Sequence, residues 1–167
     1  MDQDDLFRRL AVALAIGLLI GLERGWQLRE EAEGERTAGL RTHALTGLLG
    51  GICAALSVAS HPAVLAAGLV SFSAAFALFA WLEASSEHNF SVTGVVAAIL
   101  TFVLGAYAVL GHPLVAVACG VAMAVLLALK EPLHVWVRRL SWLELRAVLV
   151  LLAMSFFVAA RAAQPNH

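Results

Sequence analysis

The sequence predicts an all-α fold, a polytopic transmembrane helical bundle of about six spans with one interfacial amphipathic helix. Of its 167 residues, 61% are hydrophobic and 14% are charged, whereas about 25% of the residues in a soluble domain are charged. Residues 42–82 and 88–129 form two stretches, 41 and 42 residues long, that contain no Asp, Glu, Lys or Arg. A soluble protein of this size needs more polar surface, so ordinary soluble proteins and disordered chains are excluded.

The middle four spans follow from the length of these stretches and from the points where they are interrupted. A membrane-crossing helix needs about 20 mostly apolar residues, and each uncharged stretch is about twice that length. His61-Pro62 interrupts the first stretch and His112-Pro113 the second. Because proline disfavours a helical residue before it and starts helices well, we expect two tight helical hairpins. Their spans are predicted at 43–59 and 63–82, and at 91–110 and 113–129.

Two further spans flank the hairpins. Residues 6–22 predict a short first span, near whose start Arg8 and Arg9 can extend to the membrane interface. Residues 144–163 predict the last span. In the segment 131–143, apolar residues recur at helical spacing with polar residues opposite them, which predicts an amphipathic helix on the cytoplasmic membrane face. The expected organisation is therefore a five-span domain at 6–130, the interfacial helix at 131–143 and a sixth span at 144–163.

The positive charges predict an orientation. Eight Lys and Arg residues lie on the side that holds the loops after the first, third and fifth spans, and three lie on the other side. Because cytoplasmic loops are enriched in Lys and Arg, we expect the N-terminus and both His-Pro turns outside the cytoplasm. The net charge is −1, so no basic surface indicates a nucleic-acid partner.

Small residues predict which helices pack together. Gly17 and Gly21 lie four residues apart in the first span, and Gly47 and Gly51 lie four apart in the second. Such ridges of small residues let two helix backbones approach closely in a membrane. We therefore expect the first two spans to pack against each other, with Gly39 adding to the packing where the second span begins.

A polar cluster follows from that pairing. Glu23 and Arg24 end the first helix, while Arg41, Thr42 and His43 begin the second, so these side chains converge at the cytoplasmic boundary. Three interpretations stay open. Glu23 forms an ion pair with Arg24 or Arg41 that closes the helix pair; the helix N-terminus binds the phosphate of a lipid or metabolite; or a cation or proton passes Glu23, with His43 as the titrating group.

Enzyme signatures are missing from the sequence. It contains no zinc-type His-Glu-x-x-His motif, no G-x-S-x-G elbow and no phosphate-binding loop. We therefore expect no enzymatic activity and no cofactor, and Cys53 and Cys119 are expected to be small hydrophobic residues. Mg²⁺ as a ligand or transported ion stays open, although no metal ligands can be assigned, since Mg²⁺ prefers oxygen ligands and the arginines nearby would repel it.

The residues of this cluster also carry a family resemblance. Residues 17–24 (GLLIGLER) and 38–45 (AGLRTHAL) resemble the signature of the MgtC/SapB membrane family, and residues 102–106 (FVLGA) are similar to a later glycine-rich helix of that family. The resemblance covers residues of about 8 to 130. The chain from Glu87 to Arg146 is similar to the subgroup in which this domain is followed by a second, uncharacterised membrane domain. The motif positions are Gly21, Glu23, Arg24, Gly39, Arg41, Thr42 and His43.

The resemblance implies a bacterial inner-membrane protein linked to growth under magnesium limitation and, in pathogens, to survival inside host cells. For some members it implies regulation of membrane partners such as the ATP synthase. Two departures stand out. We expect the soluble C-terminal domain of the best-known virulence members to be absent, and the loop between the half-motifs is longer and rich in glutamate.

The expected function is support of magnesium homeostasis, or adaptation to low magnesium, by a non-enzymatic inner-membrane protein that acts on other membrane proteins. The alternative is a transporter or channel for Mg²⁺ or another ion, with the polar cluster lining its pathway. The middle spans contain few polar side chains beyond Ser57, Ser71, Ser73 and Thr101, which favours the regulator. The expected partners are the lipid bilayer, other membrane proteins and a second copy in a homodimer, because six short helices have little surface to bury alone.

Overall fold

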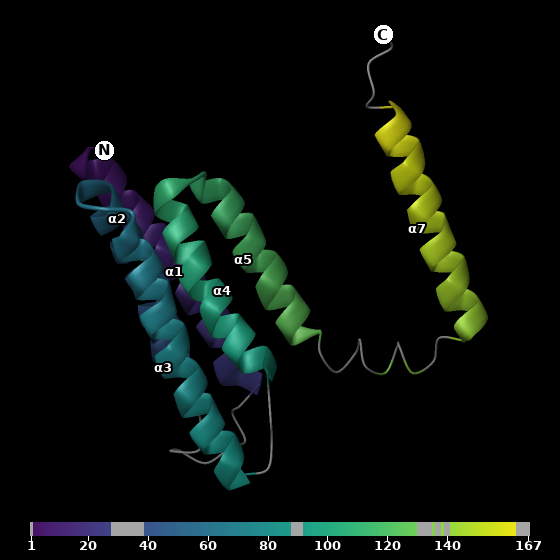
Figure 1. Ribbon diagram of the computed structural model, residues 1–167, viewed down its shortest axis with the longest axis horizontal. Coiled ribbons are helices and arrows are strands. Elements are labelled where there is room, and N and C mark those ends of the chain that lie inside the picture. The colour runs from purple at the N-terminus through teal and green to yellow at the C-terminus, as the bar shows by residue number, and fades with distance from the viewer. Residues whose placement is uncertain are drawn as a thin grey trace. The chain divides into compact units, whose positions relative to one another are not determined.

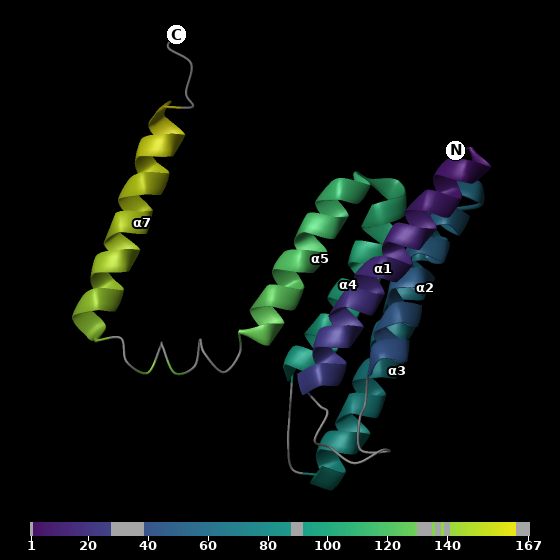
Figure 2. The same cartoon turned by 180° about the vertical axis from the view of Figure 1, so that it is seen from behind.

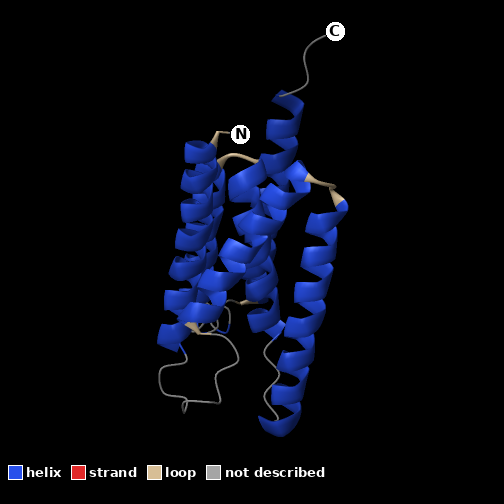
Figure 3. Ribbon diagram, turned by 90° about the vertical axis from the view of Figure 1, so that its left-hand side faces the viewer, coloured by secondary structure: helices blue, strands red, loops and turns tan. Residues whose placement is uncertain are grey.

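The computed structural model describes residues 2–27, 39–87, 92–129, 135, 138 and 141–162. These residues are helical apart from short turns and helix ends, and none of them is in a strand (Figure 3). The all-α fold is therefore confirmed. Six helices have defined bounds: α1 (Gln3–Gln27), α2 (Leu40–Ala59), α3 (Ala63–Glu87), α4 (Val92–Leu110), α5 (Pro113–Ala128) and α7 (Trp142–Ala162).

The two His-Pro turns separate the helices where the sequence predicts. α2 ends before Ser60 and α3 begins at Ala63, and the His61 ring atom Nδ1 accepts a hydrogen bond of 3.1 Å from the Ala63 backbone N–H. This bond satisfies one of the free amides in the first turn of α3. In the second turn, Pro113 is itself the first residue of α5, a position where its missing N–H costs nothing.

The chain divides into two compact units, Met1–Ala128 and Leu129–His167. The first unit contains α1 to α5 and the second contains α7. α7 begins at Trp142, two residues before the predicted start of its span, because Ser141 and Glu144 form a capping box. Most of the segment 131–143 lies outside the described residues, so its amphipathic helix stays a prediction.

In the first unit, α1 to α5 run side by side (Figures 1 and 2). The most extensive contact joins α1 to α2, and α2 and α4 follow. The expected packing of the first two spans is therefore confirmed. α4 touches every other helix of the unit, whereas α3 contacts only α2 and α4, and α5 contacts only α1 and α4.

Glycines bring the backbones of α1, α2 and α4 into direct contact. A Cβ on Gly17 would collide with the backbone of His43, and one on Gly47 would lie 2.5 Å from the Ala13 carbonyl oxygen. Toward α4, a Cβ on Gly105 would collide with the backbone of Gly47. The three helices are therefore locked together through positions that only glycine can occupy.

The glycine prediction needs one correction and one addition. A Cβ on Gly39 would meet no described atom within 4 Å, so none of the close helix contacts among the described residues depends on Gly39; it is the residue before α2, in extended conformation with φ of −95° and ψ of −162°. Gly50 and Gly105 were not predicted as packing positions, yet both contact backbone across the α2–α4 interface. The four-residue spacing of Gly47 and Gly51 predicts only the contact of α2 with α1. Gly50 lies on the part of α2 that meets α4, and no spacing pattern marks it.

Three helices are long and apolar enough to cross a membrane: α2, residues Ala63–Leu82 of α3, and α4. The helix α5 is apolar but has only 16 residues, fewer than the roughly 20 that a membrane-crossing helix needs. The membrane nature of the chain is supported by these helices, while the count of six spans stays a prediction. The first unit also exposes many large apolar side chains, which in a bilayer face lipid acyl chains.

Candidate functional site at the end of α1

The last turns of α1 lie against the first turn of α2. A Cβ on Gly21 would be 2.9 Å from Leu40 Cα and 3.1 Å from His43 Cβ, and one on Gly25 would be 3.9 Å from the Leu40 backbone nitrogen. Because Gly21 and Gly25 have no side chains, the two backbones come this close. Arg24, which precedes Gly25, lies near the N-terminus of α2 and within electrostatic reach of His43, whereas Glu23 is two positions from both glycines and lies on another face of α1.

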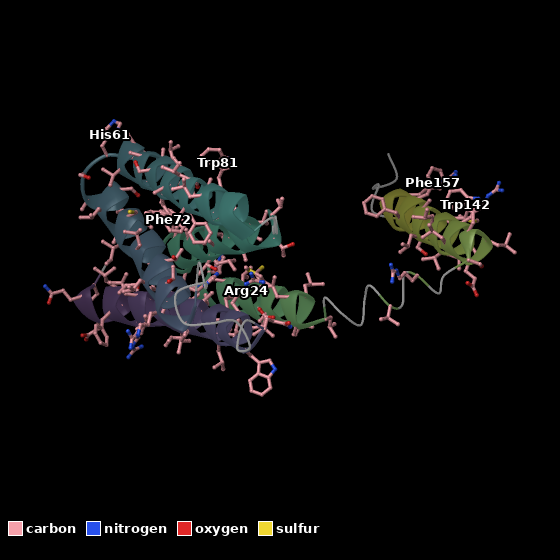
Figure 4. All side chains as sticks on the ribbon, turned by 90° about the horizontal axis from the view of Figure 1, so that it is seen from below. Arg24, His61, Phe72, Trp81, Trp142 and Phe157 are labelled. Carbon is pink, nitrogen blue, oxygen red and sulfur yellow. The ribbon has the colours of Figure 1, made fainter. Side chains whose placement is uncertain are left out.

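Arg24 extends from α1 to α4. Its Nη2 atom lies 3.3 Å from the position of a Cβ on Gly94, in the first turn of α4. The Nε atom of Arg24 is buried and has no hydrogen-bond partner. In Figure 4 the Arg24 side chain lies inside the unit, among neighbouring helices, whereas His61 projects outward from its turn. The guanidinium thus occupies the junction of α1, α2 and α4 without full hydrogen bonding.

His43 is the most buried polar residue of this end, with 1% of its surface exposed. Its Nδ1 atom lies 3.3 Å from the Gly39 carbonyl oxygen. A carbonyl only accepts hydrogen bonds, so Nδ1 carries the hydrogen and the neutral ring has a lone pair at Nε2. Nε2 is buried and has no partner. The ring also lies within electrostatic reach of Arg24.

Glu23 adds a carboxylate to the same end of the bundle. Both of its oxygen atoms are buried, and neither has a partner in hydrogen-bonding geometry, although the Gln27 amide approaches from one turn further along α1. Arg24 lies within electrostatic reach of the carboxylate. Among the described side chains, however, no ion pair joins Glu23 to Arg24 or to Arg41. The ion pair that the described residues do form, Asp5–Arg9, lies near the other end of α1.

The structure separates the five predicted cluster residues. Arg24 lies within electrostatic reach of both Glu23 and His43, while Arg41 is exposed and Thr42 is half-buried. The Thr42 carbonyl accepts a hydrogen bond of 2.7 Å from the Thr46 hydroxyl one turn later in the same helix. Arg41 points away because residue 41 is two positions from His43, and neighbours at that spacing lie on different faces of a helix.

Gly94 is a residue of this site that the sequence analysis missed. It is the position in α4 against which the Arg24 guanidinium lies. A glycine two residues inside an otherwise apolar helix was the available signal, since such a residue often allows close approach of another group. Nothing in the spacing, however, links residue 94 to residue 24.

The hydrogen-bonding capacity of this end is unbalanced. Three buried acceptor atoms, the two Glu23 oxygens and His43 Nε2, lack partners, against one donor, Arg24 Nε. Buried polar atoms of this kind normally have partners, and those that lack one in the protein are often completed by a ligand or water. Among the described residues, no three His, Cys, Asp or Glu side chains gather as they would to hold a metal ion.

The opposite end of α1 has a closed polar network. Arg9 Nε lies 2.9 Å from Asp5 Oδ2, and Arg9 Nη1 donates to the carbonyls of Val109 and Gly111 at 3.1 and 2.9 Å. Arg9 therefore binds the C-terminus of α4, where carbonyls lack helical partners. Val109 and Gly111 lie at the end of a candidate membrane-crossing helix, and the expectation that Arg9 extends to the membrane interface stays a prediction.

The two half-motifs thus meet in space, with Gly17 and Gly21 of the first against the residues from Leu40 to Ala44 of the second. No curated protein and no solved structure gives a match to this chain. The model of the MgtC family matches residues 10–136, which include both half-motifs and all five helices of the first unit from the third turn of α1 onward. The chain therefore belongs to the MgtC family.

Proposed function

We propose that this chain is a non-enzymatic regulator in the bacterial inner membrane, which supports adaptation to low magnesium by acting on other membrane proteins and not by conducting ions. Membership of the MgtC family supports a magnesium-related role in a membrane. The choice between regulator and conduit depends on the interior of the first unit.

The observation that carries the proposal is the backbone contact among α1, α2 and α4. Contacts at Gly17, Gly47, Gly50 and Gly105 fill the centre of the unit with main-chain atoms. Around them the core consists of small and apolar side chains such as Ala13, Ile16, Ala54, Phe102 and Ala106. Since helix backbones in direct contact leave no room for water, this interior supports a sealed bundle.

The buried hydroxyl groups lead to the same conclusion. Thr46 and Thr101 are the buried hydroxyl residues among those described, and each donates a 2.7 Å hydrogen bond to a carbonyl of its own helix, those of Thr42 and Ala97. Such bonds satisfy the hydroxyl within the helix. An ion pathway needs polar groups that face a water-filled space across the membrane, and these hydroxyls are already engaged.

One observation favours the alternative of an ion conduit. Glu23 and His43 keep unpartnered acceptor atoms at one end of the bundle, as the entrance to a cation pathway would. The glycine contacts begin immediately beyond this end, at Gly17 and His43. A conduit would therefore need α1 to separate from α2 at positions where their backbones touch.

The test is Mg²⁺ flux into proteoliposomes that contain the whole chain, beside Glu23→Gln and, as a matched control at the same end, Arg41→Gln. We expect no flux above empty liposomes from any of the three. The same chain should restore growth at low magnesium to a bacterium that lacks its own MgtC-family protein. Flux that the wild type supports and Glu23→Gln abolishes would contradict the proposal and establish the conduit.

A further inference from the structure

We propose that His43 makes the contact between α1 and the first turn of α2 sensitive to acid. The first turn of α2 stays packed against α1 while the His43 ring is neutral, and proton uptake by the ring releases that turn. This inference goes beyond the proposed regulatory role and does not depend on it. It concerns one end of the α1–α2 contact, and the backbone contacts deeper in the bundle stay closed in both states.

His43 is enclosed where α2 begins against α1. A Cβ on Gly21 would lie 3.1 Å from the His43 Cβ and 2.9 Å from the Leu40 Cα. The His43 residue is 1% exposed, and its backbone nitrogen and its ring atom Nδ1 lie 3.2 and 3.3 Å from the Gly39 carbonyl oxygen. The ring is therefore shut off from the solvent as long as the first turn of α2 lies against α1.

The neutral ring fits this position and the protonated ring does not. A neutral ring that donates from Nδ1 to the Gly39 carbonyl keeps only a lone pair at Nε2. Protonation would add an N–H donor and a positive charge at Nε2, which is buried and has no partner among the described residues. Burial of an unpaired charge is costly, so proton uptake favours an arrangement in which Nε2 reaches water.

The charges around the ring add to this cost. From α1, Arg24 lies within electrostatic reach of His43, and its positive charge repels a protonated ring. Glu23 lies on another face of α1, and Arg41 is exposed on another face of α2. In α4 the one titratable side chain is Tyr107, near the opposite end of the bundle. Among the described side chains, therefore, no carboxylate is placed to stabilise the protonated ring.

The first turn of α2 can be released without opening the rest of the bundle. Gly39 provides no side-chain cap for α2, and an uncapped helix end opens at low cost. This turn meets α1 at Gly21 and Gly25, close to the end of α1 at Gln27. Two turns further into α2, Gly47 lies against the backbones of both α1 and α4. The release therefore stops before the level of Gly47.

The experiment is hydrogen–deuterium exchange of the whole chain in detergent, followed by mass spectrometry from about pH 8 to about pH 5. Rates are corrected for the intrinsic pH dependence of amide exchange. A histidine in water has a pKa of about 6.5. Because the open state binds one proton more than the closed state, the open population should rise below this pH, by at most about tenfold per pH unit. We expect this loss of protection at the amides of residues 43–46, whose hydrogen bonds form the first turn of α2, and not at residues 97–106 of α4.

Four variants assign the pH dependence to His43. His43→Gln keeps an amide that can donate to the Gly39 carbonyl but takes up no proton, so it should abolish the pH dependence. Arg24→Gln removes the repelling charge and should make the total loss of protection smaller. His61→Gln is the matched control, since His61 is an exposed histidine in the turn after α2, and Glu23→Gln controls for a carboxyl at the same end. Both controls should behave as the wild type does.

Three outcomes would overturn the proposal. The first is protection of residues 43–46 that does not change with pH in the wild type. The second is a pH dependence that survives in folded His43→Gln, because another group would then be titrating. The third is an equal loss at residues 43–46 and at residues 97–106, because acid would then unfold the whole unit. Circular dichroism and gel filtration show which variants are folded, and the wild-type comparison of the two segments is decisive if His43→Gln is not.

Discussion

The two ends of α1 each hold an arginine beside an acidic residue, and the structure treats them in opposite ways. Arg9 reaches Asp5 and two carbonyls at the end of α4, at distances between 2.9 and 3.1 Å. Arg24, about four helical turns away, lies at the start of α4 with its Nε atom unpartnered, next to an equally unpartnered Glu23. One end is closed by the protein itself and the other is not.

This difference separates stabilising charges from charges retained for another purpose. When a charge is paired and hydrogen-bonded in the fold, removal of its partner lowers the stability of the protein. A buried charge without a partner already lowers that stability, so its removal costs little. Four predictions test the distinction, and each compares a substitution with a neighbour that should be silent. All refer to the whole chain in detergent without added lipid.

The largest effect is expected between the two ends, at Gly17→Leu. A side chain there meets the His43 backbone, which cannot move aside as a side chain can, so the substitution should lower the free energy of unfolding by at least about 3 kcal/mol or prevent folding. Both ends of α1 would then lose their fixed distance from α4. Chemical unfolding followed by circular dichroism measures this, with Gly39→Ala as the control, since space is open there. Wild-type stability for Gly17→Leu would contradict the close contact.

The second effect concerns the closed end. Arg9→Gln removes the partner of Asp5 and two donor contacts to α4 carbonyls, so we expect a loss of about 2 kcal/mol in the free energy of unfolding. Arg8→Gln is the control because Arg8 is exposed. Equal stability of the two variants in the same unfolding experiment would show that the closed end contributes nothing.

The third prediction concerns the open end. Arg24→Gln removes a charge that has no ion-pair partner among the described residues, and we expect the free energy of unfolding to stay within about 0.5 kcal/mol of wild type, or to rise. The measurement is the same unfolding curve, set beside that of Arg9→Gln. A loss as large as for Arg9→Gln would show that the open end is structural, and the comparison of the two ends would fail.

The smallest effect is expected at His61→Ala. The His61 ring accepts one hydrogen bond from the Ala63 amide in an exposed turn, and loss of a cap of this kind costs about 0.5 kcal/mol at the lower end of its range. His112→Ala is a control in the other turn, because the described contacts of His112 involve its backbone carbonyl only. If both variants unfold alike, the cap in the first turn has no measurable value.

The elements of this fold could be predicted from the sequence because their signals are local. An uncharged stretch twice the length of a membrane helix, cut by His-Pro, leaves little freedom for where helices begin and end, and α2 through α5 lie within a few residues of the predicted spans. The pairing of α1 with α2 was also predictable, because each carries a glycine ridge and the two helices follow each other in the chain.

The site could be predicted only in part. Glu23, Arg24 and His43 were expected together because the α1–α2 pair brings them there, but the contribution of α4 was not, since Gly94 and Arg24 are joined by no sequence pattern. The contact of Arg9 with Val109 and Gly111 is of the same kind. Periodicity tells which face of a helix is small or apolar, and it does not tell which distant helix occupies that face.

The glycine contacts also determine where the first unit can change shape. α1, α2 and α4 meet through main-chain atoms at several levels, so a sliding or turning movement of one against another would drive backbone into backbone at each level. α3 and α5 do not contact each other, and each touches only two of the three central helices. Sliding or turning is therefore less hindered for α3 and α5 than for the three central helices, whose backbones meet directly.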